Sequence, residues 1–258
     1  MQIAHISDLH IVADTGPVGL VQPDAVARAR ALIRDLSAFR PKLDLVVITG
    51  DTANDARPDE YAELAGLLAD LPIPYIVIPG NHDDRHLLRQ VAGEQAYADA
   101  DLMYHKRDCG QARIFALDTL SQGEIGGRLL PPQLDWLAQE IGNPFEGHTF
   151  VAMHHPPCAP RMGRLDKAIL LEGQDALRSI LDAQRQTVTV LCGHMHRPFS
   201  AFFGRSLVSA ATSTAFQFEL QLDAQHEPPT SAAPYHYVIH VIDAQGGHVM
   251  HRQTPALS

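Results

Sequence analysis

The stretch IAHISDLH, residues 3–10, decides the fold, because an apolar run leads directly into two potential metal ligands. Residues 3–7 have the composition of a buried strand, and Asp8 and His10 follow at its end. The same arrangement recurs in LVVITGD, residues 45–51, where a second strand pattern leads into Gly50 and Asp51. Because ligands bind outside the carboxyl ends of strands in open α/β sheets, these side chains predict a site at one edge of a sheet.

Strand and helix patterns alternate along the chain, which is typical of an α/β fold. We expect strands at residues 3–7, 45–49, 75–78, 113–117, 149–153 and 188–192, with three more near 207–210, 237–242 and 249–252. Amphipathic helices fit residues 23–39, 58–71, 84–92, 132–141 and 172–184, and Pro23 suits the first turn of the first helix. No linker divides the 258 residues convincingly, so we predict a single domain spanning residues 1–258.

One segment lacks this alternation of strand and helix patterns. Residues 212–234 are polar and include HEPPTSAAP at 226–234. Long loops of this kind are usually functional or contact another chain. We therefore expect the C-terminal extension, residues 205–258, to form a cap over the site or a subunit contact in a homo-oligomer, a dimer or larger. A mobile surface loop is the alternative.

The charge balance argues against nucleic acid as a partner. Asp and Glu number 30 against 20 Lys and Arg, so the chain repels polyanions at long range. No apolar run reaches the roughly 20 residues that a membrane span needs, and the N-terminus lacks a signal core, so we expect a cytoplasmic protein. The three cysteines have no metal-type spacing, and we expect reduced thiols.

Short polar motifs follow five of the predicted strands. They are Asp8-Leu9-His10, Gly50-Asp51, Gly80-Asn81-His82-Asp83, His154-His155-Pro156-Pro157 and Gly193-His194-Met195-His196. Each alone has an ordinary explanation, such as a capping Asp, a turn or a surface His. Together, in this order and each behind a strand, they predict one converging site. The glycines that precede candidate ligands indicate sharp turns and close approach of the main chain.

The converging side chains are two carboxylates, one carboxamide and at least four imidazoles. This mixture suits Mn, Fe, Co or Zn better than a thiolate zinc site does. There are enough ligands for two divalent ions, and a carboxylate between the ions would offset their mutual repulsion.

These motifs resemble the calcineurin-like metallophosphoesterases, whose pattern is D-x-H, G-D, G-N-H-D/E, H and G-H-x-H in that order. ISDLH, PGNHDD, MHHPP and CGHMH look most like the class III cyclic nucleotide phosphodiesterase and glycerophosphodiesterase branch. The resemblance covers roughly residues 1–200, and beyond them only STAFQ and the strand near Tyr235 match loosely. It implies a four-layer αββα sandwich with a C-terminal extension.

The resemblance also implies roles for individual residues. Asp8, His10 and His196 would hold one ion, Asn81, His154 and His194 the other, and Asp51 would bridge. His82 would act on the leaving group as the catalytic residue and contact the substrate, while His155 would pack nearby. Asn54 could reach a phosphate oxygen or form an Asx-turn, and Asp83 could orient a neighbour or lie at a helix N-terminus.

The expected reaction is hydrolysis of a small-molecule phosphodiester, a 3',5'-cyclic nucleotide or a glycerophosphodiester, by a metal-bound hydroxide. A promiscuous phosphomonoesterase is the nearest alternative. A nuclease fits the acidic charge balance poorly. A non-catalytic metal-binding scaffold would be expected to have lost ligands or the leaving-group histidine, and none is missing from the pattern.

Overall fold

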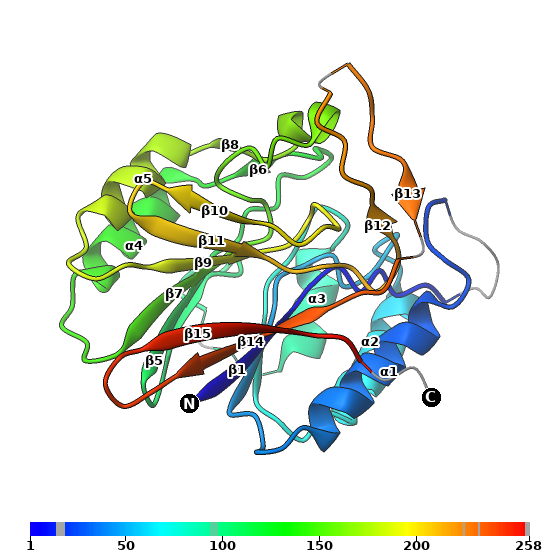
Figure 1. The fold of residues 1–258 in the computed structure, drawn as a ribbon, viewed down its shortest axis with the longest axis horizontal. Helices are drawn as coiled ribbons and strands as arrows, with labels where there is room; N and C mark the ends of the chain where they lie inside the picture. The colour runs from blue at the N-terminus through cyan, green and yellow to red at the C-terminus, as the bar shows by residue number, and fades with distance from the viewer. Residues whose placement is uncertain (14–18, 94, 96, 224, 232, 256–258) are drawn as a thin grey trace.

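Two β-sheets pack face to face in the computed structural model, with helices on their outer faces (Figure 1). The structure describes residues 1–13, 19–93, 95, 97–223, 225–231 and 233–255. In the described part of the chain, no helix is long and apolar enough to cross a membrane.

The first sheet has the strand order β15-β14-β1-β2-β3. Its strands are Gln2–Ile6 (β1), Leu45–Ile48 (β2), Tyr75–Val77 (β3), Tyr237–Ile242 (β14) and His248–Gln253 (β15). β1, β2 and β3 are parallel, whereas β14 and β15 add to the sheet as antiparallel strands. The C-terminal extension therefore completes the same sheet that the N-terminus begins.

The second sheet has the order β10-β11-β9-β7-β5-β4. Its strands are His105–Cys109 (β4), Ala112–Ala116 (β5), His148–Ala152 (β7), Thr189–Cys192 (β9), Ser200–Phe203 (β10) and Ser206–Ala210 (β11). The four central strands are parallel, and antiparallel β4 and β10 close the two edges.

Helices and short elements connect the strands. The helices are Ala25–Ala38 (α1), Pro58–Ala69 (α2), Arg85–Ala92 (α3), Pro131–Ile141 (α4), Gln174–Asp182 (α5) and the 3-10 turn Gly163–Lys167 (η1). Two small ladders join Gly127–Arg128 (β6) to Leu170–Glu172 (β8), and Gln217–Phe218 (β12) to Thr230–Ser231 (β13).

The central strands are buried on both faces, which is why their sequences are continuously apolar. In β2, Leu45 and Val47 face the second sheet and pack with Phe150, whereas Val46 and Ile48 face the helices. This alternation follows from the two-residue period of a strand. One apolar cluster thus lies between the sheets, and two others attach α1–α3 to the first sheet and α4–α5 to the second. The four-layer αββα expectation is confirmed.

The predicted strands and helices all form, but some boundaries were wrong. Pro23 lies outside α1, which begins at Ala25 after Asp24. Glu172 belongs to β8 and not to the following helix, which begins at Gln174. The edge strand β4 was not predicted, because its sequence HKRDC is polar and has no apolar alternation.

Within residues 212–234, the short strands β12 and β13 pair as an antiparallel ladder (Figure 1). Beyond β12 the segment reaches η1. There a Cβ added at Gly163 would lie 2.7 Å from the carbonyl oxygens of both Asp223 and His226, and Arg164 pairs with Glu227 at 3.5 Å. The segment is therefore tied within the chain at its far end. Contact with a second subunit stays a prediction that size-exclusion chromatography tests.

Candidate metal centre

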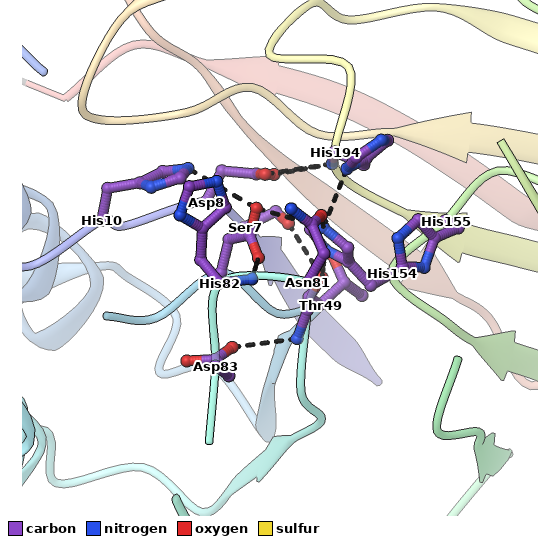
Figure 2. Close-up of polar contacts among 12 residues, drawn as sticks. Ser7, Asp8, His10, Thr49, Asn81, His82, Asp83, His154, His155 and His194 are labelled. Atoms are coloured by element: carbon purple, nitrogen blue, oxygen red, sulfur yellow. Dashed lines mark hydrogen bonds and ion pairs between the residues drawn. The ribbon is translucent and has the colours of Figure 1, made fainter. Parts of the chain in front are cut away.

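All five motifs meet at the carboxyl ends of four central strands and of β3. Asp8 and His10 follow β1, Asp51 follows β2, and Asn81 follows β3 in the first sheet. His154 follows β7 in the second sheet, and His194 and His196 follow β9. Contacts join the two sheets here: the backbone N–H of His194 donates to the Asp8 carboxylate at 3.0 Å (Figure 2), and His154 pairs with Asp51. The sequence prediction of one converging site agrees with this placement.

The backbone at five of these positions adopts the left-handed region that only glycine enters easily. The φ angles are 54° at Asp8, 43° at His10, 48° at Asp51, 69° at His194 and 45° at His196. Such conformations cost of order 1–3 kcal/mol each and persist only where the surroundings enforce them. Their concentration in one place marks this edge of the sheets as a functional site.

Two glycines let these loops approach each other. A Cβ at Gly80 would overlap the carboxylate of Asp51, and one at Gly193 would overlap Ser7 and the carboxylate of Asp8. Any larger residue would therefore push a carboxylate away from the other candidate ligands. These contacts give a physical reason for the glycines in the GNHD and GHMH motifs.

The first group of candidate ligands comprises Asp8, His10, Asp51 and His196, which are all buried. His10 Nε2 lies 3.0 Å from His196 Nε2, and His196 Nε2 lies 3.3 Å from Asp8 Oδ1. Four potential donor atoms thus lie within one coordination sphere of each other.

The second group comprises Asn81, His154 and His194 (Figure 2). His154 Nε2 lies 3.2 Å from Asn81 Oδ1 and 3.2 Å from His194 Nδ1. His155 is near enough to be grouped with these histidines, and its ring lies 4.6 Å from that of His194. Both of its nitrogens already have partners, since Nδ1 lies 2.8 Å from Thr119 Oγ1 and Nε2 donates to the Ile125 carbonyl at 3.0 Å.

Asp51 lies between the two groups. Its Oδ2 is 3.6 Å from His10 Nε2 on one side and 3.2 Å from His154 Nε2 on the other. Its Oδ1 accepts a hydrogen bond from the backbone N–H of His82 at 2.9 Å, which fixes the plane of the carboxylate. One oxygen of this carboxylate therefore faces both groups.

Main-chain and amide oxygens fix the tautomer of three imidazole rings. His154 donates from Nδ1–H to the Thr49 carbonyl at 2.7 Å, and His196 donates from Nδ1–H to the Phe216 carbonyl at 3.2 Å. His10 donates from Nδ1–H to Asn54 Oδ1 at 3.2 Å. In each neutral ring the lone pair is then on Nε2. Sequence reasoning missed Thr49 and Phe216, because a backbone carbonyl carries no residue-specific signal.

These tautomers leave acceptors facing acceptors. The Nε2 lone pairs of His10 and His196 lie 3.0 Å apart, and neither can donate a hydrogen bond to the other while Nδ1 holds the proton. A cation between such atoms satisfies them all. Imidazole, carboxylate and carboxamide donors are the ligands that Mn, Fe, Co and Zn accept, so the residues fit divalent metal ions.

Electrostatics keep the carboxylates charged in this buried place. Burial favours the neutral acid, but the imidazoles of His154 and His10 outweigh it and hold the pKa of Asp51 well below its usual range. Asp51 in turn overcomes the effect of burial on His154 and raises its pKa to about 9. Burial lowers the pKa of His10 and of His194 to about 3. Metal binding requires deprotonated ligands, so His154, whose pKa is raised, would have to release a proton first.

Asp83 joins two of the ligand loops. Its buried carboxylate accepts from the backbone N–H groups of Thr52, Ala53 and Gly80 at 2.9 to 3.2 Å, and from the Tyr61 hydroxyl at 3.1 Å. The helix N-terminal role that the sequence also allowed belongs instead to Asp84, which caps α3 by accepting from Leu87 N at 2.9 Å.

His82 and Asn54 lie beside the first group. The His82 side chain is exposed, its ring lies 4.7 Å from that of His10, and its Nδ1 donates to the Asn54 carbonyl at 2.6 Å. Asn54 uses its side-chain oxygen for His10 and its main-chain oxygen for His82. It therefore fixes the orientation of both rings.

Comparison with known proteins gives matches over most of the chain. A family model described as calcineurin-like phosphoesterase matches residues 1–198. A cAMP/cGMP dual specificity phosphodiesterase of Mycobacterium tuberculosis is 35% identical over 231 residues, which cover 86% of this chain and 70% of the relative. A probable glycerophosphodiester phosphodiesterase of Arcobacter nitrofigilis is 27% identical over 242 residues, covering 91% and 88%.

A solved structure has the same fold. The crystal structure of a dimetal phosphatase from Danio rerio superposes with a TM-score of 0.71, covering 99% of this chain and 96% of the other. The sequence identity is 12%, so this similarity concerns the arrangement of the chain alone.

Proposed function

This chain belongs to the calcineurin-like phosphoesterase family, and on that premise we propose that it hydrolyses small-molecule phosphodiesters with two divalent metal ions. Its substrates are 3',5'-cyclic nucleotides or glycerophosphodiesters, the classes named for the relatives from Mycobacterium tuberculosis and Arcobacter nitrofigilis. The acidic charge balance, with a formal net charge of -10, supports a small substrate over nucleic acid.

Asp8, His10 and His196 would hold the first ion, and Asn81, His154 and His194 the second. Asp51 would hold both. The observation that carries this proposal is the position of Asp51 Oδ2, 3.6 Å from His10 Nε2 and 3.2 Å from His154 Nε2. An anion there would offset the repulsion between two neighbouring dications. The donor set suits Mn, Fe, Co or Zn.

When bound, such ions polarise the phosphoryl group and make a water molecule acidic enough to supply the nucleophile at neutral pH. The chain itself has two further tasks. In its imidazolium form His82 gives the Nε2 proton to the departing alkoxide and becomes neutral, while Nδ1–H keeps its hydrogen bond to the Asn54 carbonyl. The amide nitrogen of Asn54 is the candidate donor to a phosphate oxygen, because its oxygen is already paired with His10.

A substrate panel tests the proposal. Protein of measured metal content is assayed with cyclic nucleotides, glycerophosphodiesters and simple monoesters, and kcat/KM is compared at equal metal loading. We expect at least one diester to exceed every monoester. A higher kcat/KM for monoesters would assign the chain to the phosphomonoesterase alternative, and no turnover of any ester by protein with two ions would favour a scaffold.

A further inference from the structure

A segment beyond the residues that the family model matches contacts the candidate metal centre directly. The match ends at residue 198, yet residues 213–218, which follow β11 and include β12, bond to the loops that carry Asp8, His10 and His196. We propose that residues 213–218 form a C-terminal clamp that sets the affinity of the first metal ion and affects the second much less. This inference rests on the two-ion function proposed above.

The clamp holds the loop of the first ligands through its carbonyls. The hydroxyl of Ser213 donates to the Asp8 carbonyl at 2.7 Å, and the backbone N–H of Thr214 donates to the same oxygen at 3.3 Å. The hydroxyl of Thr214 donates to the Leu9 carbonyl at 3.2 Å. Ser213 and Thr214 are completely or almost completely buried, so water cannot replace these bonds.

These bonds fall where the backbone is strained. Asp8 and His10 have φ angles of 54° and 43°, and Leu9 lies between them. An L-residue relaxes out of this region unless neighbouring contacts over-determine its conformation. Release of the Asp8 or Leu9 carbonyl would therefore turn the Asp8 carboxylate and the His10 ring away from a shared ion.

The clamp also orients His196. The ring donates from Nδ1 to the Phe216 carbonyl at 3.2 Å, and the backbone N–H of Phe218 donates to the His196 carbonyl at 3.2 Å. The ring of Phe216 lies 4.1 Å from that of His196 and 6.1 Å from that of His10. The segment thus fixes the tautomer of one ligand and covers two ligands with an apolar ring.

Further hydrogen bonds hold the clamp in place. Ser213 Oγ accepts from Ala215 N at 2.9 Å, the Gln217 side chain donates to the Ser213 carbonyl, and Gln22 N donates to the Ala215 carbonyl at 3.2 Å. It cannot shift as a free loop would.

The second ion has different supports. Among the residues that the structure describes, no hydrogen bond joins 213–218 to Asn81, His154 or His194. His154 is oriented by the Thr49 carbonyl at 2.7 Å, and Ser7 donates to that same carbonyl at 3.1 Å. The two sets of supports meet at Asp8, whose carboxylate also accepts a hydrogen bond from the backbone N–H of His194 at 3.0 Å, so the clamp acts on the second ion only indirectly. Loss of an outer-shell partner typically weakens metal binding 10- to 100-fold.

The test is titration of metal-stripped protein with Co²⁺, followed by calorimetry. Asn81→Ala identifies the binding step of the second ion, because Asn81 belongs only to that group. Ser213→Ala and Thr214→Val should each weaken the other step by about tenfold or more and weaken the second-ion step by a distinctly smaller factor. Far-UV circular dichroism of the metal-free variants checks folding, and Thr214→Val decides if Ser213→Ala does not fold.

Thr212→Val is the matched control. The Thr212 hydroxyl lies in the same connection but bonds to His236, donating to its carbonyl at 2.7 Å and accepting from its N–H at 2.8 Å. This variant should keep both steps. The clamp is contradicted if Ser213→Ala and Thr214→Val keep both steps, weaken both equally, or have no larger effect than Thr212→Val. A wild-type protein with a single step would instead contradict the two-ion assignment itself.

Discussion

The His82 ring donates from Nδ1 to the main-chain carbonyl of Asn54 at 2.6 Å, and this bond leaves Nε2 as the free nitrogen of an exposed imidazole. The backbone N–H of His82 is bonded to Asp51 Oδ1 at 2.9 Å, so the residue is fixed relative to the carboxylate that faces both ligand groups. A nitrogen held in this way can serve the leaving group without binding a metal.

We therefore expect His82→Ala to keep both ions and to lose activity according to the leaving group. An alkyl or ribose alkoxide needs a proton, and its hydrolysis should fall about 10²- to 10⁴-fold. A nitrophenolate departs without one, so nitrophenyl diesters should lose far less. Measured kcat values for the two substrate classes check this. An equal loss in both would mean that His82 positions the phosphate, and loss of an ion would make it a ligand.

Asn54→Ala distinguishes two roles for this side chain, orienting His10 and contacting the substrate. The substitution keeps the carbonyl that holds His82 but removes Oδ1, which holds His10 at 3.2 Å. We expect the affinity for one ion to fall roughly 10- to 100-fold. Metal titration measures this change. An unchanged affinity with a raised KM would show that Asn54 acts on the substrate alone.

Asp83 and its neighbour Asp84 form a matched pair for stability. Asp83→Ala leaves the N–H groups of Thr52, Ala53 and Gly80 without their acceptor and should lower the free energy of unfolding by about 3 kcal/mol or more. Asp84→Ala removes only the cap of α3, which is worth about 1 kcal/mol. Urea unfolding of the metal-free proteins checks both values. Equal losses would refute the role of Asp83 in joining the loops.

A histidine group between the sheets predicts acid sensitivity. His240 Nδ1 lies 3.0 Å from His248 Nε2, and Thr189 Oγ1 lies 2.8 Å from His148 Nε2. Burial lowers the pKa of His148 to about 4 and that of His5 to about 3, and it holds the pKa of His240 well below 6.5. All of them are therefore neutral in the folded protein at pH 7.

The direction in which stability changes with pH follows from these lowered pKa values. Above about pH 6.5 the histidines are neutral in both states, and their contribution to stability is complete. As the pH falls toward 4, the unfolded chain takes up protons that the folded chain cannot, so each such histidine lowers stability by about 1.4 kcal/mol per pH unit. In metal-free protein unfolded by urea at pH 8, 6 and 5, His240→Leu should reduce this slope. The exposed His251→Leu should not, and equal slopes for both would contradict the account.

Sequence patterns predicted the elements in which buried residues recur at a regular spacing. β2, with the sequence LVVI, was predictable because both of its faces are covered, whereas the polar edge strand β4 carries no such pattern. The candidate ligands were predictable for a similar reason, since Asp8, Asp51 and His154 each follow a buried strand.

The contacts that hold the ligands were less predictable. The Thr49 and Phe216 carbonyls orient His154 and His196, but any residue could supply a carbonyl. Residues 212–234 were singled out as unusual, yet their composition gave no sign that residues 213–218 reach the Asp8 loop. That contact depends on the way in which two distant segments pack.

Asp51 provides the most direct test of the two-ion centre. Metal content per chain is measured by elemental analysis for the wild type, Asp51→Ala and Asn81→Ala, each purified and loaded in the same way. We predict about two ions in the wild type, loss of both in Asp51→Ala because the bridging anion is gone, and loss of chiefly one in Asn81→Ala. Equal metal loss in the two variants, or a fully active wild type with a single ion, would contradict the account.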